Sequence, residues 1–160
     1  MNIRKTTLGD LEEVKKIYEY ARKFMKINNN ATQWGDSKPA LSQIIEDINK
    51  GKSYVCVGNA AEILGVFYYS IEEDPTYKKI DGSWLNNELY GVVHRIAVKE
   101  NKKGVGSYCL NWAFNNYNNL RIDTHENNIP MKSLLLKMGF RYCGIIYLAD
   151  GNPREAYQKN

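Results

Sequence analysis

The sequence predicts a mixed α/β (α+β) fold in which one mostly antiparallel central sheet is flanked by helices. Its first half contains β-rich segments joined by a short link, and its second half alternates strands with helices. The chain has 160 residues, 43% of them hydrophobic, which is enough for one core. Because no repeat or linker interrupts it, we expect one domain over residues 1–160, with the order βααββ, a long loop, then βαβαββ.

Two amphipathic helices and a hairpin are predicted in the first half. Apolar residues recur at spacings of three and four in both helices, and Thr7-Leu8-Gly9-Asp10 resembles a capping box before the first. Gly51 is placed as the C-terminal stop of the second helix. The expected elements are a strand at 2–5, helices at 11–25 and 41–48, and hairpin strands at 54–57 and 63–69.

A long loop separates these elements from the second half. Residues 72–88 contain Pro75, Gly82 and Trp84 and predict no regular structure, and long loops in compact domains are often functional. The expected elements after it are strands at 90–98, 120–124, 140–148 and 155–158, with helices at 104–117 and 130–138. An Asp150-Gly151-Asn152 turn joins the closing strands.

Composition and charge exclude several classes of protein. The net charge is only +4 and the basic residues are dispersed, unlike the concentrated basic face of a nucleic-acid binder. No apolar run approaches the roughly 20 residues that span a bilayer, and the N-terminal residues do not resemble a signal peptide. The three cysteines lack metal-binding spacing. We therefore expect a cytoplasmic protein with free thiols and no metal, nucleic-acid or membrane partner.

The strongest motif is a glycine turn between a strand and a helix. His94–Val98 leads through Lys99–Lys103 into Gly104-Val105-Gly106-Ser107. Glycines let backbone amides converge without Cβ atoms in the way, and a helix N-terminus favours an anion. The motif is neither a Walker A loop nor a dinucleotide fingerprint, because the required lysine and third glycine are missing. The two readings of the turn are a pyrophosphate cradle and an ordinary turn before a surface helix.

Two motifs together resemble the GNAT superfamily of N-acetyltransferases. Arg95-Ile96-Ala97-Val98 followed by Asn101-Lys102-Lys103-Gly104-Val105-Gly106 is similar to its acetyl-CoA motif, with Asn101 where the family prefers Gln or Arg. Asn128-Ile129-Pro130-Met131, with Gly139-Phe140 eleven and twelve residues after the asparagine, resembles its second motif. The resemblance covers nearly the whole chain and implies the GNAT-like fold.

The resemblance implies acetyl-CoA as co-substrate and assigns residues to it. The backbone of Ile96, Ala97 and Val98 is expected to pair with the pantetheine arm like an added strand. The pyrophosphate is expected on the amides of Lys102, Lys103, Gly104, Val105, Gly106 and Ser107, with Asn128 bonding the arm or phosphate region. The family often has a tyrosine acid seven residues after this asparagine, where this chain has Leu135. Tyr142, Tyr147 and Tyr157 are candidate replacements, although strand tyrosines more often pack.

An acetyl transfer also needs a base for the acceptor amine. His94 is the first candidate, because alternation along the strand puts it on the same face as Ile96 and Val98. Glu88 is the second, if the strand extends back unbroken, and Glu72 or Glu73 could act through water. We expect a small-molecule or peptide amine near Trp34, Glu72 and Trp84, with packing as the alternative role for both tryptophans.

Two other functions stay open on the sequence. The missing tyrosine suggests a non-catalytic acyl-CoA-binding regulatory domain on the same fold. A small basic domain with its glycine loop on nucleic-acid phosphates is the second, and the dispersed lysines argue against it. The acceptor amine is not identified by the sequence. GNAT proteins often pair, so a homodimer is consistent with the resemblance.

Overall fold

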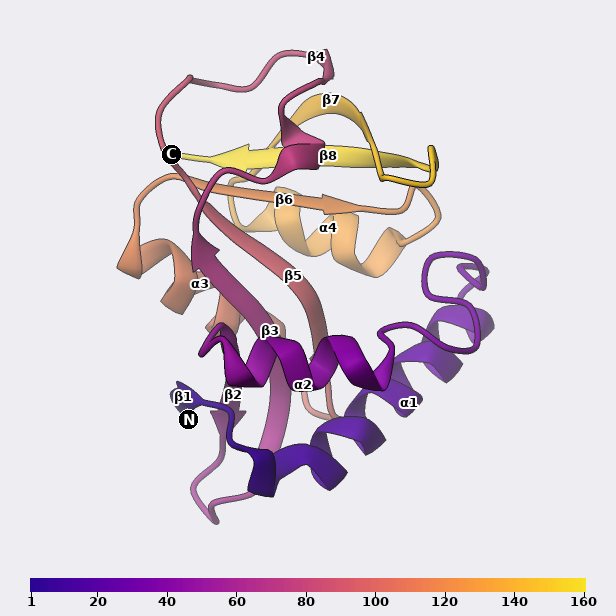
Figure 1. Ribbon diagram of the computed structural model, residues 1–160, viewed down its shortest axis with the longest axis vertical. Coiled ribbons are helices and arrows are strands. Elements are labelled where there is room, and N and C mark those ends of the chain that lie inside the picture. The colour runs from indigo at the N-terminus through magenta and orange to yellow at the C-terminus, as the bar shows by residue number, and fades with distance from the viewer.

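The computed structural model describes residues 1–160 as one eight-stranded sheet with helices on both faces (Figure 1). The strand order is β1-β2-β3-β5-β6-β8-β7-β4, and only the β5–β6 pair is parallel. This confirms the predicted mixed α/β class with a mostly antiparallel sheet. The strands are β1 (Asn2–Lys5), β2 (Ser53–Val57), β3 (Ile63–Ile71), β4 (Asp81–Gly82), β5 (Gly91–Val98), β6 (Leu120–Thr124), β7 (Arg141–Tyr147) and β8 (Pro153–Lys159).

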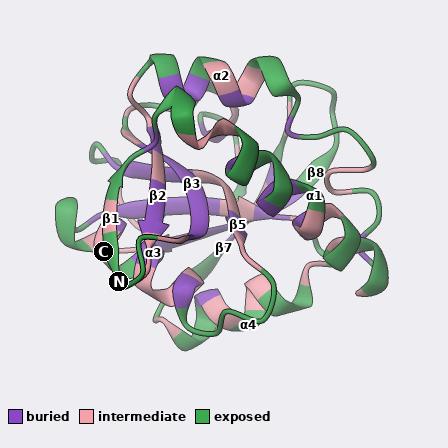
Figure 2. Ribbon diagram, turned by 90° about the horizontal axis from the view of Figure 1, so that it is seen from below, coloured by how far each residue is buried: buried purple, intermediate pink, exposed green.

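Four α-helices cover the sheet in two layers (Figure 2). They are α1 (Leu11–Ile27), α2 (Leu41–Asn49), α3 (Val105–Asn116) and α4 (Ile129–Lys137), with short 3-10 helices η1 (Leu8–Asp10) and η2 (Pro75–Tyr77). Helices α1 and α2 bury their apolar stripes against one face, around Val14, Ile17 and Val66. Helix α3 and Leu135 of α4 pack on the other face. None of the helices combines the length and apolar character needed to cross a bilayer.

The segment expected to be an unstructured loop contains two short elements. Residues 75–77 form η2, and Asp81–Gly82 form β4, which pairs with β7. A Cβ atom on Gly144 would lie 2.1 Å from the carbonyl oxygen of Asp81, so only glycine permits this pairing. The prediction of no regular structure here was wrong because the pairing depends on a distant glycine.

Strands β5 and β6 pair only at their beginnings and then separate (Figure 1). Gly91 faces Leu120 and Val92 faces Arg121, and no later residue of β5 pairs with β6. The backbone of β5 from Val93 onward therefore has a strand partner, β3, on one side only. This opening creates the space in which the candidate functional site lies.

A β-bulge in β5 changes which way its side chains point. Tyr68 of β3 pairs with His94 and Val66 pairs with Ala97, so two β5 residues stand opposite Phe67. Arg95 within the bulge has a positive φ of 50°. The bulge breaks the alternation on which the sequence argument relied.

The predicted common face of His94, Ile96 and Val98 is consequently wrong. The His94 ring lies beside the Tyr68 and Tyr77 rings, on the side where Val92 packs. Ile96 and Val98 pack instead on the opposite side, against the core under α3. One extra residue in the strand is enough to reverse the parity.

Candidate functional site

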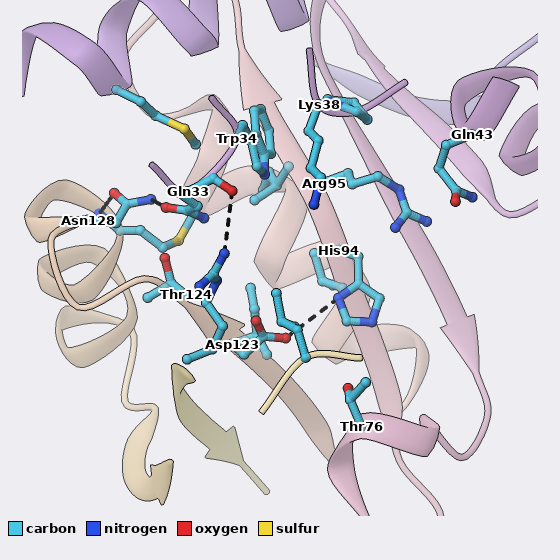
Figure 3. A pocket seen from close by; sticks show the side chains of 18 of the residues that line it. Gln33, Trp34, Lys38, Gln43, Thr76, His94, Arg95, Asp123, Thr124 and Asn128 are labelled. Carbon is cyan, nitrogen blue, oxygen red and sulfur yellow. Dashed lines mark hydrogen bonds and ion pairs between the residues drawn. The ribbon is translucent and has the colours of Figure 1, made fainter. Parts of the chain in front are cut away.

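A cleft of about 450 Å³ opens where β5 and β6 diverge (Figure 3). Its walls come from the middle of β5, the end of β6, the loop between α1 and α2, and the start of η2 with its cap Asp74, together with residues of α2, α4 and β8. Gln33 and Trp34 line one side, and the Trp34 ring meets Tyr18 edge-on with centroids 5.7 Å apart. The polar side chains thus reach the cleft from parts of the chain that are far apart in the sequence.

His94 lies in the cleft and forms a short contact with a carboxylate. Its Nε2 lies 2.6 Å from Oδ2 of Asp74, while Oδ1 of Asp74 accepts hydrogen bonds from the amide and hydroxyl of Thr76. Burial alone would raise the pKa of Asp74, but the hydrogen bonds from His94 and Thr76 outweigh it and lower that pKa to about 2. Asp74 is therefore an anion at neutral pH, held in place by η2.

A second carboxylate lies beside the other imidazole nitrogen. Oδ2 of Asp123 is 3.8 Å from Nδ1 of His94 and accepts a 2.6 Å hydrogen bond from the Tyr77 hydroxyl. Burial and the charge of Asp123 raise the pKa of Tyr77, so Tyr77 stays a donor. Since Nε2 donates its proton to Asp74, the lone pair of neutral His94 is on Nδ1. That nitrogen can accept a proton from a molecule in the cleft.

Two arginines add positive charge to the same cleft. Arg95 donates to both carboxylate oxygens of Asp47 on α2, at 2.8 and 3.0 Å, and its guanidinium lies 4.7 Å above the Tyr68 ring. Arg154 of β8 donates only to two backbone carbonyls, those of Pro153 and Gln33. Asp47 thus neutralises Arg95, whereas no carboxylate lies within ion-pair distance of Arg154.

A second cavity of about 430 Å³ follows the glycine turn. It runs between α1 and the end of β5, and its lining includes most of the residues that the resemblance assigns to the coenzyme: Ile96, Ala97, Val98, Lys102, Lys103, Gly106 and Asn128. Gly104 has a φ of 80°, and α3 starts after it without a side-chain cap. The amides of Val105, Gly106 and Ser107 make no hydrogen bond within the protein. The turn therefore offers free donors and lysine side chains to an anion.

The two cavities share a wall. Met25, Ile96, Asn128 and Met131 line both of them. Asn128 caps α4 by accepting a hydrogen bond from the amide of Met131, and its side-chain amide donates to Gln33. A long ligand in the groove would accordingly present its end to His94 near Ile96.

Several residues predicted for the acceptor or for catalysis lie elsewhere. Glu88 is exposed in a loop, and β5 begins only at Gly91, so the unbroken strand that its role required does not exist. Glu72 is occupied by Lys52 and Tyr68 outside the cleft. Trp84 donates to the Tyr77 carbonyl and stacks on Arg121, also outside the cleft. Of the predicted acceptor residues, only Trp34 lines it.

None of the three tyrosines predicted as replacements for the absent acid reaches the cleft. Leu135 is fully buried in the core under α3, so its position does not face the cleft. Tyr142 and Tyr147 are largely exposed, Tyr157 is buried against Tyr142, and none of the three lines either cavity. The suggestion that one of them replaces the acid is wrong in geometric terms.

The sequence analysis missed several charged residues of the cleft, among them the two carboxylates near His94 and the unpaired arginine. Asp74 lies in the segment predicted to have no structure, and Asp123 and Arg154 lie on strands whose pairing was unknown. The signal for Asp74 was local, since a short acidic residue before a proline is a common cap of a helical turn. Nothing local distinguishes Arg154 from the other arginines of the chain.

Solved structures resemble the chain over nearly its whole length, while no family model and no curated protein matches it. An acetyltransferase of the GNAT family from Streptococcus agalactiae 2603 superposes with a TM-score of 0.89 and 29% identity, covering 99% of this chain and 94% of that one. This similarity confirms the resemblance to the GNAT superfamily that the two sequence motifs carry.

Other GNAT structures agree with this assignment. A candidate acetyltransferase from Staphylococcus aureus Mu50 has a TM-score of 0.74 and 25% identity, covering 100% of this chain and 99% of that one. The GNAT phosphinothricin acetyltransferase from Sinorhizobium meliloti, in complex with AcCoA, shares the fold at a TM-score of 0.66 and 14% identity, over 99% of this chain and 86% of that one. Acetyl transfer is thus the general reaction that these relatives support.

Proposed function

We propose that this GNAT chain, as a single domain over residues 1–160, is an N-acetyltransferase. It moves the acetyl group of acetyl-CoA to the primary amine of a small-molecule acceptor by direct attack in a ternary complex. The observation that carries the proposal is the shared wall of the two cavities at Ile96 and Asn128. It brings the end of a groove suited to a long anionic coenzyme next to an imidazole that can take up a proton.

The groove has the features that a pantetheine pyrophosphate requires. The β5 edge that faces away from β3 has free backbone groups beyond Val92, to which the pantetheine amides can bond as a strand would. The free amides of α3, together with Lys102 and Lys103, supply donors and positive charge for the pyrophosphate. In this proposal the thioester lies near Ile96.

His94 acts as the base in this mechanism. The amine nitrogen attacks the thioester carbonyl carbon, an N–C bond forms, and the C–S bond breaks with the electron pair leaving on sulfur. Nδ1 of His94 accepts the proton that the amine loses, directly or through a water. The ionised Asp74 stabilises the resulting imidazolium, as the carboxylate of a catalytic triad does.

Departure of the thiolate does not depend on a tyrosine here. A thiol has an ordinary pKa of about 8.5, so its anion is a good leaving group near neutral pH. Leu135 is therefore compatible with turnover, although its presence is also the observation that favours a non-catalytic acyl-CoA-binding domain. The two functions make the same prediction for coenzyme binding and opposite predictions for turnover.

The experiment that tests the proposal is an amine screen with acetyl-CoA that reads the free thiol released. Thermal unfolding with added ligand comes first, and acetyl-CoA at 100 times its Kd should stabilise the fold by about 2.7 kcal/mol. ATP and NAD serve as controls and should stabilise it much less. An unchanged melting temperature in millimolar acetyl-CoA contradicts the coenzyme site, and binding without thiol release across the panel favours the regulatory domain.

A further inference from the structure

Arg154 lies on the same face of the sheet as the His94 pair. Asp123 of β6 faces Ala156 of β8, and Arg154 is two residues before Ala156 on a strand that pairs regularly with β6. Side chains two residues apart on a strand point to the same side. His94, Asp123 and Arg154 therefore form a row across β5, β6 and β8, and all three line the cleft.

The Arg154 side chain lines the cleft, and no carboxylate lies within ion-pair distance of its guanidinium. The residue is only 8% exposed, yet its hydrogen bonds go to two carbonyl oxygens, at 2.8 Å to Pro153 and 3.4 Å to Gln33. A guanidinium has five N–H donors in a planar fork, so most of the donors of Arg154 have no hydrogen-bond partner within the protein. Burial lowers the pKa of Arg154, with Asp123 and Asp150 opposing that shift. A buried cation that lacks a close counter-ion is destabilising unless a ligand supplies one.

The other buried arginine at this side of the sheet has aromatic neighbours instead of an anion, and its Nε has no hydrogen-bond partner. Arg121 lies between two aromatic rings, 4.2 Å from Trp84 and 3.9 Å from Tyr90, donates to the carbonyl of Asn86, and does not line the cleft. Arg95 has Asp47. Arg154 is the one arginine of the cleft whose fork is left for a ligand.

We propose that Arg154 binds a carboxylate of the acceptor, so that the substrate is an amine that also carries a carboxylate. The reaction in this inference rests on the proposed function, whereas the binding of a carboxylate at Arg154 does not. Asp74 and Asp123 form a negative pole that suits the ammonium group, and Arg154 forms a positive pole that suits the carboxylate. The cleft is thus complementary to a zwitterion.

The test compares matched acceptors with and without the carboxylate. Each L-amino acid is paired with its decarboxylated amine. Likewise β-alanine is paired with ethylamine, and 4-aminobutyrate with propylamine. The carboxylated members differ in the distance between the amine and the acid. Thiol release gives kcat/KM, and calorimetry in the presence of CoA gives acceptor affinity. At least one carboxylated member should exceed its partner by about 10- to 100-fold, the usual range for a charge-assisted contact.

Arg154→Gln should reduce the ratio of kcat/KM between a carboxylated acceptor and its decarboxylated partner to near one, mainly by raising KM for the carboxylated acceptor. Arg154→Lys should restore part of this ratio. Arg141→Gln removes an exposed arginine of β7 and serves as the matched control, which should keep the ratio. Equal use of both members of every pair by the unmodified protein overturns the inference without touching the proposed function. That comparison does not depend on the folding of a variant.

The remaining outcomes separate the two proposals. Carboxylate-dependent binding that Arg154→Gln abolishes, with no thiol released, supports the inference while the proposed function fails. A preference that survives Arg154→Gln assigns the carboxylate to another residue and overturns it. The inference is also overturned if no member of any pair binds or is acetylated.

Discussion

Replacing Asp74 by asparagine isolates the contribution of one negative charge to the His94 site. In the structure Oδ1 of Asp74 accepts both hydrogen bonds from Thr76, and Oδ2 contacts His94. An asparagine can keep Oδ1 as the cap of η2 and place an amide group where Oδ2 was. That amide donates to Nε2, which forces the ring proton onto Nδ1 and removes the lone pair that accepts the amine proton.

The size of both effects follows from the structure. The pKa of Asp74 is lowered from 3.8 to about 2, which corresponds to a preference of about 2 kcal/mol for the ionised side chain in the folded protein. Asp74→Asn should therefore lower the free energy of unfolding by up to about 2 kcal/mol at pH 7. Turnover should fall by about 10²- to 10⁴-fold, the range for losing an oriented base.

The pH dependence has a definite sign. A depressed carboxyl pKa stabilises the fold fully above pH 3.8, and this contribution is lost as the pH falls through about 2. The stability difference between the unmodified protein and Asp74→Asn, measured by urea unfolding, should accordingly shrink between pH 4 and pH 2. Thiol release with the best acceptor measures the loss of turnover.

Asp10→Asn is a matched control for Asp74→Asn. Hydrogen bonds from Arg4, at 2.7 and 2.9 Å, are the main reason that the pKa of Asp10 is also lowered to about 2, and Asp10 caps the helical start far from the cleft. Its replacement should cost about 1 kcal/mol of stability and leave turnover unchanged. Turnover of Asp74→Asn within threefold of the unmodified protein would refute the assignment of His94 as a base oriented by Asp74.

Three further changes test other parts of the structure. Gly106→Asp should abolish acetyl-CoA binding by calorimetry while the fold survives, because its Cβ would meet only side-chain atoms, of Leu134 at 3.2 Å and Val98 at 3.9 Å. Normal binding would locate the pyrophosphate elsewhere. Asp47→Asn should lower the free energy of urea unfolding by about 2–3 kcal/mol, because it removes the charge that neutralises Arg95, and an unchanged midpoint would contradict this. Gly144→Ala should destabilise by more than about 1 kcal/mol in the same assay, since its Cβ would lie 2.1 Å from the Asp81 carbonyl oxygen, and a neutral effect would mean that β4 does not pair as described.

The sequence alone determined the elements whose signal is local. The apolar spacing of α1 and α2, the capping pattern at Thr7–Asp10 and the turn before α3 each lie within a few residues, so periodicity and composition were sufficient to find them. The free amides at the start of α3 belong to consecutive residues, so the glycine turn could be recognised from the sequence as a candidate anion site. The strand order and β4 could not be read this way, since the pairing of β4 depends on Gly144, some sixty positions later.

Only the tertiary structure decided which side chains meet in the cleft. A single extra residue opposite Phe67 put Ile96 and Val98 on the other side of the strand from His94, which faces Asp74 and Asp123, and no pattern in the residues 90–98 marks that bulge. Arg154 reaches the same cleft because β8 pairs with β6 in one particular register. Register and bulges are set by the packing of the whole sheet, so the positions of His94 and of the charges around it follow from long-range contacts.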